Sequence, residues 1–273
     1  MTGRHSDLSA AHIAAFRRDI RAFYRRHGRH LPFRETNDPY AITVAEIMLQ
    51  QTTVERVTPY YEAWLRRFPD WQTVAAAPIR AVLAAWSGLG YNRRALYLQK
   101  LAQTVVGEYG GELPSDPAVL RRLPGIGPYT ANAVAAFAFG RRVAAVDTNV
   151  RKVLLHRFGL AADARPAEIQ RIAELVLPRT GIRAWHAALM DYARLGLPPR
   201  ESRRLRVRRQ PRFEGSIRQI RGEIIRRLTR RSRVSLGTLA RDLGRSMAEV
   251  RAAAEGLARD GLAVATGRTV RLP

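Results

Sequence analysis

Apolar residues recur at helical spacing along most of the chain. Near the start, Ile13, Phe16 and Ile20 mark one helix face, with Ser9 before them as N-cap and Gly28 after them as C-cap. The same period predicts further helices at about 40–50, 54–68, 79–86, 92–109, 116–121, 129–139, 148–158, 166–177 and 183–196. We expect a loop over 30–40. The pattern therefore predicts a mainly α fold.

The pattern changes after Leu197. Pro198 and Pro199 stop the preceding helix, and an arginine-rich stretch follows in which Glu201 is the acidic residue. We interpret 199–214 as a linker, either solvated or tracking phosphates.

Residues 215–273 form a separate, smaller pattern. Apolar positions at 217–228, from Val234 and at 247–257 predict three helical elements, and the alternation around Gly267 predicts a two-stranded hairpin. Three helices and a hairpin are typical of a winged-helix domain. Its third helix either binds DNA or packs against the rest of the protein.

The charge indicates the partner. The formal net charge is +24, and apart from Lys100 and Lys152 the basic residues are arginines. A field of this strength attracts polyanions, and arginine makes bidentate phosphate contacts. The chain has no cysteine, which excludes disulfides, thiolate metal sites and iron–sulfur clusters.

The segment Leu123-Pro124-Gly125-Ile126-Gly127-Pro128-Tyr129 joins two predicted helices through a tight turn. The glycines allow the backbone to turn sharply and approach a ligand. The amide N–H groups at the start of the second helix then favour an anion. We interpret this segment as a helix-hairpin-helix that binds DNA phosphate through Gly125, Ile126 and Gly127.

Two acidic residues are candidates for catalysis. Glu46 lies within the apolar run Ile42–Leu49, where a carboxylate is costly unless it is protonated or paired, so a raised pKa is expected. Asp147 precedes the helix predicted from 148, which by itself indicates an N-cap.

Five motifs in one order carry a resemblance. They are Leu31-Pro32-Phe33-Arg34 with Asp38-Pro39-Tyr40, then Glu46–Thr52, Gly88-Leu89-Gly90-Tyr91, the hairpin, and Val146–Val150. Together they resemble the adenine DNA glycosylase branch of the endonuclease III superfamily over about residues 12–195. The resemblance implies a domain over 1–198 with two helical lobes, one over about 36–140 and the other from 1–35 plus 141–198, and an active site between them.

The resemblance also implies roles for individual residues. Glu46 matches the general acid that protonates the flipped adenine, and Asp147 matches the carboxylate that stabilises the oxocarbenium-like sugar. Asn149 orients this region, and Tyr129 stands beside the acids. Bifunctional relatives carry a lysine where Tyr129 stands, and a phenol cannot form their Schiff base. We therefore expect hydrolysis alone, without strand cleavage.

The same motifs imply contacts to DNA. Gln51 and Tyr91 match residues that wedge into the duplex, assisted by Leu89, and Thr52 matches a contact to the base opposite the target. Arg34, Leu49 and Gln50 are counted with the substrate-binding residues.

Two departures from the family leave alternatives open. Four family cysteines that hold a [4Fe–4S] cluster are missing, and Arg203, Arg204 and Arg206 are expected to make the DNA contacts of that loop. The tail differs from the domain that reads 8-oxoguanine. We therefore keep a thymine or uracil glycosylase acting on G·T or G·U mismatches, and a non-enzymatic DNA-binding protein, as alternatives.

Other expectations concern ions and location. A Na⁺ or K⁺ at hairpin carbonyls around Leu123 and Gly125 is implied by the family alone; no side-chain metal ligands are predicted. Without an apolar membrane span or signal segment, we expect a cytoplasmic, nucleoid-associated monomer that binds double-stranded DNA.

Overall fold

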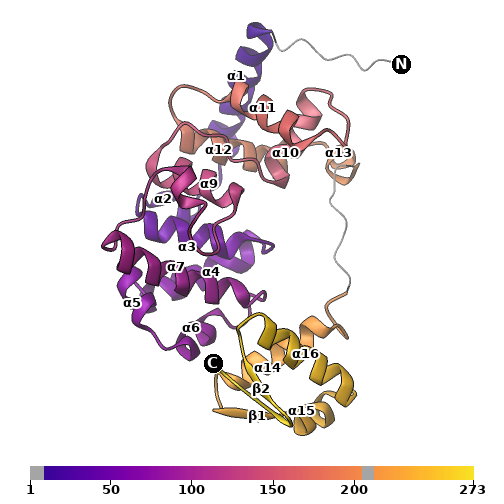
Figure 1. Ribbon diagram of the computed structural model, residues 1–273. Coiled ribbons are helices and arrows are strands. Elements are labelled where there is room, and N and C mark those ends of the chain that lie inside the picture. Colours follow the sequence, from indigo (N-terminus) through magenta and orange to yellow (C-terminus); the bar gives the residue numbers. More distant parts are fainter. Residues whose placement is uncertain (1–8, 205–211) are drawn as a thin grey trace. The chain divides into compact units, whose positions relative to one another are not determined.

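The computed structural model describes residues 9–204 and 212–273 and is mainly helical, as predicted (Figure 1). Its contacts divide into two compact units. The first takes in 9–43, 114–122 and 126–204, and the second takes in 44–113, 123–125 and 212–273. Helix α3 (Pro39–Leu49) begins in the first and ends in the second. Within the described ranges, every helix is too short or too polar to span a lipid bilayer.

The first unit is entirely helical in its described part. Besides the start of α3, it contains α1 (Ala10–His27), α2 (Pro32–Glu35), α8 (Pro117–Leu120), α9 (Pro128–Phe139), α10 (Thr148–Arg157), α11 (Pro166–Val176), α12 (Ile182–Asp191), a π-helical turn η1 (Tyr192–Gly196) and α13 (Pro199–Arg204).

The core of the first unit brings together α1 and α12, which are far apart in the sequence. Phe16 of α1 packs edge-on against Trp185 of α12, with ring centroids 5.6 Å apart, and against Phe158 at 5.1 Å. Val153 and Leu154 of α10 are fully buried in the same cluster. Because α10 follows Asp147 directly, this packing fixes the helix whose first turn carries a candidate catalytic residue.

The second unit contains the remaining helices and a small sheet. They are α4 (Val54–Arg67), α5 (Trp71–Ala76), α6 (Ile79–Trp86), α7 (Arg93–Tyr109), α14 (Ile217–Leu228), α15 (Leu236–Leu243) and α16 (Met247–Arg259), with β1 (Arg233–Ser235), β2 (Val264–Thr266) and β3 (Thr269–Arg271). Trp64 and Trp86 meet edge-on at 5.7 Å in its core.

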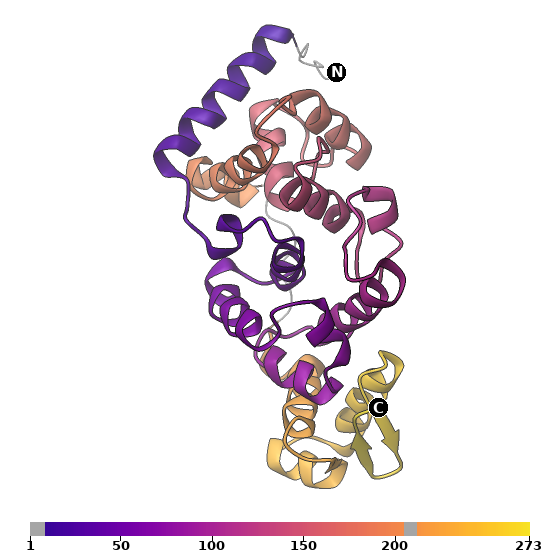
Figure 2. The ribbon, with the colours of Figure 1, turned by 90° about the vertical axis from the view of Figure 1, so that its left-hand side faces the viewer.

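Its C-terminal part confirms three helices and a hairpin, but the sheet differs from the prediction. A third strand, β1, pairs with β3, so the sheet has the order β1-β3-β2 and is antiparallel throughout (Figure 2). The predicted two-stranded hairpin is present as β2 and β3. The added strand β1 was not predicted, because it pairs with residues more than thirty positions away in the chain. Its central Val234 is 5% exposed, opposite the fully buried Val270.

Arginines join this C-terminal part to α6 and α7 within the unit. Nη1 of Arg80 donates to the carbonyls of Leu228 (2.7 Å) and Arg231 (2.9 Å). A cation at these carbonyls, at and just beyond the C-terminus of α14, satisfies acceptors that a helix end leaves unpaired. Asp260 is bridged by Arg221 of α14 and by Arg93 of α7.

Three short helices, α2, α5 and α13, were not predicted from periodicity. The interval 30–40, expected to be a loop, contains the single turn α2, and α5 was missed entirely. The signal for α5 is local: the Asp70 side chain accepts from the Thr73 amide and Thr73 reaches back, which forms a capping box.

The arginine-rich stretch begins with a helix. α13 covers the start of the predicted linker 199–214, and it contains Arg203 and Arg204, whose side chains are not described. Arg206 lies outside the described residues. The proposed DNA contacts of these three arginines therefore remain a prediction.

Candidate active site and DNA-contacting loops

Asp147 is the N-cap of α10. Its Oδ1 accepts from the Val150 amide at 2.7 Å, and its Oδ2 accepts from Nδ2 of Asn149 at 2.8 Å. The N-cap interpretation is confirmed, and it is compatible with catalysis because the cap fixes the carboxylate at the positive end of a helix. Asn149 holds the second oxygen, which fits the orienting role that the resemblance implied for it.

The extended segment before Asp147 is held by side chains. The carbonyl of Ala144 accepts from Asn132 of α9 (2.9 Å) and from Gln170 of α11 (3.2 Å). The amide of Ala145 donates to Nε2 of His186, 3.0 Å away. His186 is buried, its Nδ1 lies 2.9 Å from the Ile182 carbonyl, and burial lowers its pKa. A neutral His186 thus donates from Nδ1 and accepts at Nε2.

Burial raises the pKa of the half-buried Asp147 carboxyl. The hydrogen bonds from Val150 and Asn149 and the charge of Lys152 act in the opposite direction, because each favours the ionised form. Desolvation is the larger effect. A carboxylate held at such a cost is a signature of functional sites.

Tyr129 lies in the first turn of α9 and packs against a small apolar cluster of Ile42, Ala133, Phe137 and Ala145. Ala145 is two residues before Asp147, so Tyr129 and the segment that carries Asp147 pack against the same cluster. Ile42 comes from α3. Glu46 is one turn further along that helix, on the same face as Ile42, and is 9% exposed.

The turn between α8 and α9 has the backbone of a hairpin. Gly125 adopts the left-handed region (φ +77°), and a Cβ there would lie 2.8 Å from Cβ of Tyr97. Glycine is therefore required by both conformation and space. Gly127 is the N-cap of α9, and α8 and α9 pack against each other. Gly125 is exposed, whereas Ile126 is buried at 6% and anchors the turn rather than presenting a side chain.

The two predicted wedge residues share an unusual backbone. Gln51 (φ 59°) and Tyr91 (φ 48°) are the positive-φ residues other than glycine in the described part of the chain. Residues with side chains seldom adopt this region, and such strain concentrates at functional sites. Tyr91 is 43% exposed, whereas Leu89 is 4% exposed, so Tyr91 is much better placed than Leu89 to enter a duplex. Gln51 is exposed, and Leu49, Gln50 and Thr52 are half-buried.

Arg94 was not singled out from the sequence, although it touches both of these turns. Its guanidinium donates to the carbonyls of Met48 (2.7 Å) and Gly90 (3.1 Å) and to Oγ1 of Thr52 (3.1 Å), among others. Burial lowers its pKa to about 10. A signal was present: Arg94 is one turn before the buried Leu98, so it lies on the apolar face of α7.

Arg34 is used inside the protein. Its Nη1 and Nη2 donate to the two carboxylate oxygens of Asp191 at 2.8 and 3.1 Å, and Arg29 donates to the same group. The pair ties α2 to the end of α12. In the described structure Arg34 thus has a structural role, and the DNA contact suggested for it stays a prediction.

Comparison with known proteins agrees with these features. Residues 44–179 match the HhH-GPD superfamily of base excision DNA repair proteins. The chain is 38% identical to an adenine DNA glycosylase of Mycolicibacterium smegmatis over 228 residues, which cover 76% of this chain and 78% of that protein. The chain belongs to this superfamily. The family resemblance read from the five motifs is thereby confirmed.

Two further proteins to which this chain is similar have names that refer to thymine or uracil, the alternative target bases. A thymine/uracil-DNA glycosylase of Methanothermobacter thermautotrophicus is 31% identical over 186 residues, covering 67% of this chain and 84% of that protein. The solved structure of a thermostable thymine-DNA glycosylase superposes with a TM-score of 0.65 at 28% identity, over 72% of this chain and 93% of that one.

Apolar packing follows α12, where the resemblance places the cluster cysteines of other superfamily members. Ala193 and Leu197 are buried in the core of the first unit, and Tyr192 packs edge-on against Phe23 at 5.1 Å. Tyr192, Ala193 and Leu197 lie in or directly after the π-helical turn η1. Since the chain has no cysteine, it cannot hold a thiolate-bound iron–sulfur cluster.

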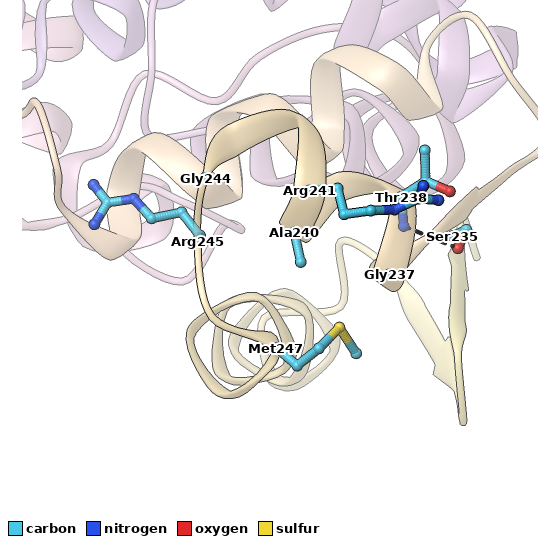
Figure 3. A pocket seen from close by; sticks show the side chains of 8 residues that line it. All are labelled: Ser235, Gly237, Thr238, Ala240, Arg241, Gly244, Arg245 and Met247. Carbon is cyan, nitrogen blue, oxygen red and sulfur yellow. Dashed lines mark hydrogen bonds between the residues drawn. The ribbon is translucent and has the colours of Figure 1, made fainter.

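Two further kinds of site are a metal site and a pocket. Among residues 9–204 and 212–273, no group of three or more His, Asp or Glu is arranged to hold a metal ion. A Na⁺ or K⁺ at hairpin carbonyls stays a prediction. An open pocket of about 540 Å³ lies between α15 and the start of α16, lined by Arg241, Arg245 and Met247 among others (Figure 3). None of the predicted site residues lines it.

Proposed function

We propose that this protein is a monofunctional DNA N-glycosylase that removes adenine mispaired with 8-oxoguanine or guanine by hydrolysis. The observation that carries the proposal is Asp147, a carboxylate fixed at the start of α10 by Val150 and Asn149 and kept there although burial raises its pKa. The 38% identity to an adenine DNA glycosylase supports the substrate.

In the proposed reaction the bond between the sugar C1′ and the adenine nitrogen breaks. Glu46 donates a proton to the leaving base, and its burial keeps water from competing for that proton. The ionised Asp147 stabilises the positive charge that develops on the sugar. Water then adds to C1′ and releases a proton, which leaves an abasic site and free adenine.

Tyr129 supports a purely hydrolytic reaction. It occupies the first turn of α9, and a phenol cannot form an imine with C1′. Lys152 is near enough to act electrostatically on Asp147, so it is the lysine to exclude by experiment. Reduction with borohydride during turnover should trap no protein–DNA adduct. A trapped adduct that disappears in Lys152→Arg would contradict the monofunctional assignment.

The DNA-binding surface is proposed to combine several elements. Gly125 and Gly127 would place amide groups of the hairpin at a backbone phosphate, and Gln51 and Tyr91 would fill the space that the extruded base leaves. The C-terminal part, with its three helices and three-stranded sheet, is proposed to be a winged-helix domain.

Substrate choice is the finer part of the proposal. A thymine/uracil-DNA glycosylase is also similar to this chain, at 31% identity, so overall similarity does not separate the two activities. The test uses four duplexes with A·8-oxoG, A·G, T·G and U·G pairs, each treated with alkali after incubation. Cleavage at adenine alone is expected. Cleavage at thymine or uracil alone would establish the rival activity, and none at all would indicate a non-enzymatic binder.

Matched variants assign the chemistry. Glu46→Gln and Asp147→Asn preserve shape and remove the carboxyl function, so each should abolish cleavage while DNA binding persists. Asp163→Asn, at an exposed loop residue, serves as a control that should keep full activity.

A further inference from the structure

The two turns that carry the wedge residues are joined by one buried cation. One turn follows α3 and contains Gln50, Gln51 and Thr52. The other connects α6 to α7 and contains Leu89, Gly90 and Tyr91. Both belong to the second unit, and Arg94, in the first turn of α7, reaches both.

The guanidinium of Arg94 has six oxygen acceptors in the described structure. Nη1 donates to the carbonyls of Ile47 (3.0 Å), Met48 (2.7 Å) and Gln50 (2.5 Å). Nη2 donates to Oγ1 of Thr52 (3.1 Å) and to the carbonyls of Leu89 (3.3 Å) and Gly90 (3.1 Å). One nitrogen therefore serves the end of α3, and the other links the two turns.

Two of these contacts cap the helix that carries Glu46. The carbonyls of Ile47 and Met48 lie in the last turn of α3, where four carbonyls lack a partner within the helix. A cation there is favoured by the helix dipole. The capping arginine thus fixes the helix turn from which the Glu46 side chain projects.

The guanidinium also stacks on two aromatic rings. It lies 5.2 Å from the Trp86 ring centroid and 5.5 Å from that of Tyr91. Nε1 of Trp86 donates to the Gly90 carbonyl at 3.0 Å, the same oxygen that Arg94 contacts. Tyr91 is therefore held from its backbone side and through its ring.

If position 94 served packing alone, an apolar side chain would be sufficient there. All six acceptors are neutral oxygens, Arg94 is only 9% exposed, and its Nε–H is buried without a hydrogen-bond partner in the part of the chain that the structure describes. Burying a cation in this way is costly, and a leucine would continue the apolar face of α7. The contacts instead define the backbone at Gln51 and Tyr91, the two strained positions.

We infer that Arg94 is a positioning residue that locks the two turns as one preorganised wedge, so that Gln51 and Tyr91 enter the duplex together while Glu46 is held in place. This inference rests on the proposed function for the identity of the target base, but base extrusion can be measured without it.

The test measures extrusion and excision separately. Duplexes carry 2-aminopurine at the target position, and its fluorescence increases when it leaves the stack. Extrusion is recorded in an Asp147→Asn background, and excision in single turnover. Arg94→Met is expected to reduce the excision rate about 100-fold, as misplaced reacting groups do, and to lose most of the fluorescence gain. Affinity for a duplex with an abasic-site analogue, which needs no extrusion, should fall far less.

A matched control separates positioning from general stability. Arg17 of α1 also caps a helix: it donates to the carbonyls of Leu175, Val176 and Leu177 at the end of α11. Arg17→Met should lower the melting temperature, yet leave extrusion unchanged in the folded protein. Arg94→Lys keeps the charge but not the planar fork, so it should fold and still lose about tenfold in excision.

The outcomes separate this inference from the proposed function. Full extrusion by Arg94→Lys, or equal losses in the Arg17 and Arg94 variants, would overturn the positioning role. Absence of a fluorescence gain in the parent protein with every mismatch would overturn it too. If the parent extrudes a base but excises none, and Arg94→Met loses the extrusion, the proposed function fails and the positioning role stands.

Discussion

Two aspartates of the first unit are held in opposite ways. Asp191 is fully buried and accepts from the guanidinium groups of Arg29 and Arg34, and these partners lower its pKa against the effect of burial. Asp147 is half-buried, is held by an amide and a carboxamide, and has a raised pKa because desolvation outweighs its hydrogen bonds.

The difference shows which carboxylate is structural. Arginine partners satisfy both oxygens of Asp191 and leave little charge for other uses. Neutral donors orient Asp147 but leave most of its charge uncompensated, so its field remains available to a developing cation. The fold is stabilised by the first arrangement and strained by the second.

The largest expected effect is that of Asp147→Asn on activity. Excision should fall at least about 10³-fold because the charge that stabilises the sugar is gone. Stability should move the other way. A raised folded pKa means that the ionised form costs stability as pH rises through that pKa, so neutral Asn, also a good N-cap, should raise the melting temperature at pH 7.5 by about 2–4 °C. Single-turnover kinetics and thermal melts check both, and a lowered melting temperature would contradict the comparison.

Asp191→Asn should lower the stability of the protein and leave its activity nearly unchanged. Two guanidinium groups lose their partner, which costs roughly 3 kcal/mol for a buried pair and about 6–12 °C in melting temperature. Because the folded pKa of Asp191 is lowered, its contribution is present above the unfolded value and is lost as pH falls through the folded one. Excision per folded molecule should stay within about twofold. A large loss of activity in fully folded Asp191→Asn would break the distinction between the two aspartates.

A substitution at His186 tests how the segment before Asp147 is held in place. Its folded pKa is lowered, so the protein should lose stability as pH falls below about 6.5, the unfolded value, with a slope of at most about 1.4 kcal/mol per pH unit. Protonated Nε2 could no longer accept from the Ala145 amide. Urea unfolding at several pH values in the Asp147→Asn background isolates the effect. His186→Gln keeps an acceptor without titrating there, so an undiminished slope in this variant would exclude His186 as its source.

The smallest expected effect belongs to Lys152. Its charge lowers the pKa of Asp147, so Lys152→Gln should raise that pKa further. The acidic limb of the activity profile should therefore move to higher pH by a few tenths of a unit, as weakly screened surface charges do. The pH dependence of single-turnover excision measures the shift. Lys100→Gln is the control for overall charge, and an equal shift in that variant would show that the effect is not local.

Much of the fold was predictable because its signals are local. Helical periodicity located α1, α7 and α10 to within a residue or two, and Gly125 marked the hairpin through its conformational freedom. The helices that were missed, α2, α5 and α13, have only four or six residues each, too few to display a period. The third strand was missed because it pairs with a partner more than thirty residues away.

The candidate site divides in the same way. Residue types and spacing determined Glu46, Tyr129 and Asp147 as candidates, since a motif is recognised by the order and type of its residues. Only the tertiary structure decided that Arg34 pairs with Asp191 and that Arg94 joins two turns about forty residues apart in the chain. An arginine finds its acceptors among carbonyls that any residue can supply, so sequence cannot name them. Packing decides where those carbonyls meet, and with them how strongly each charge is held.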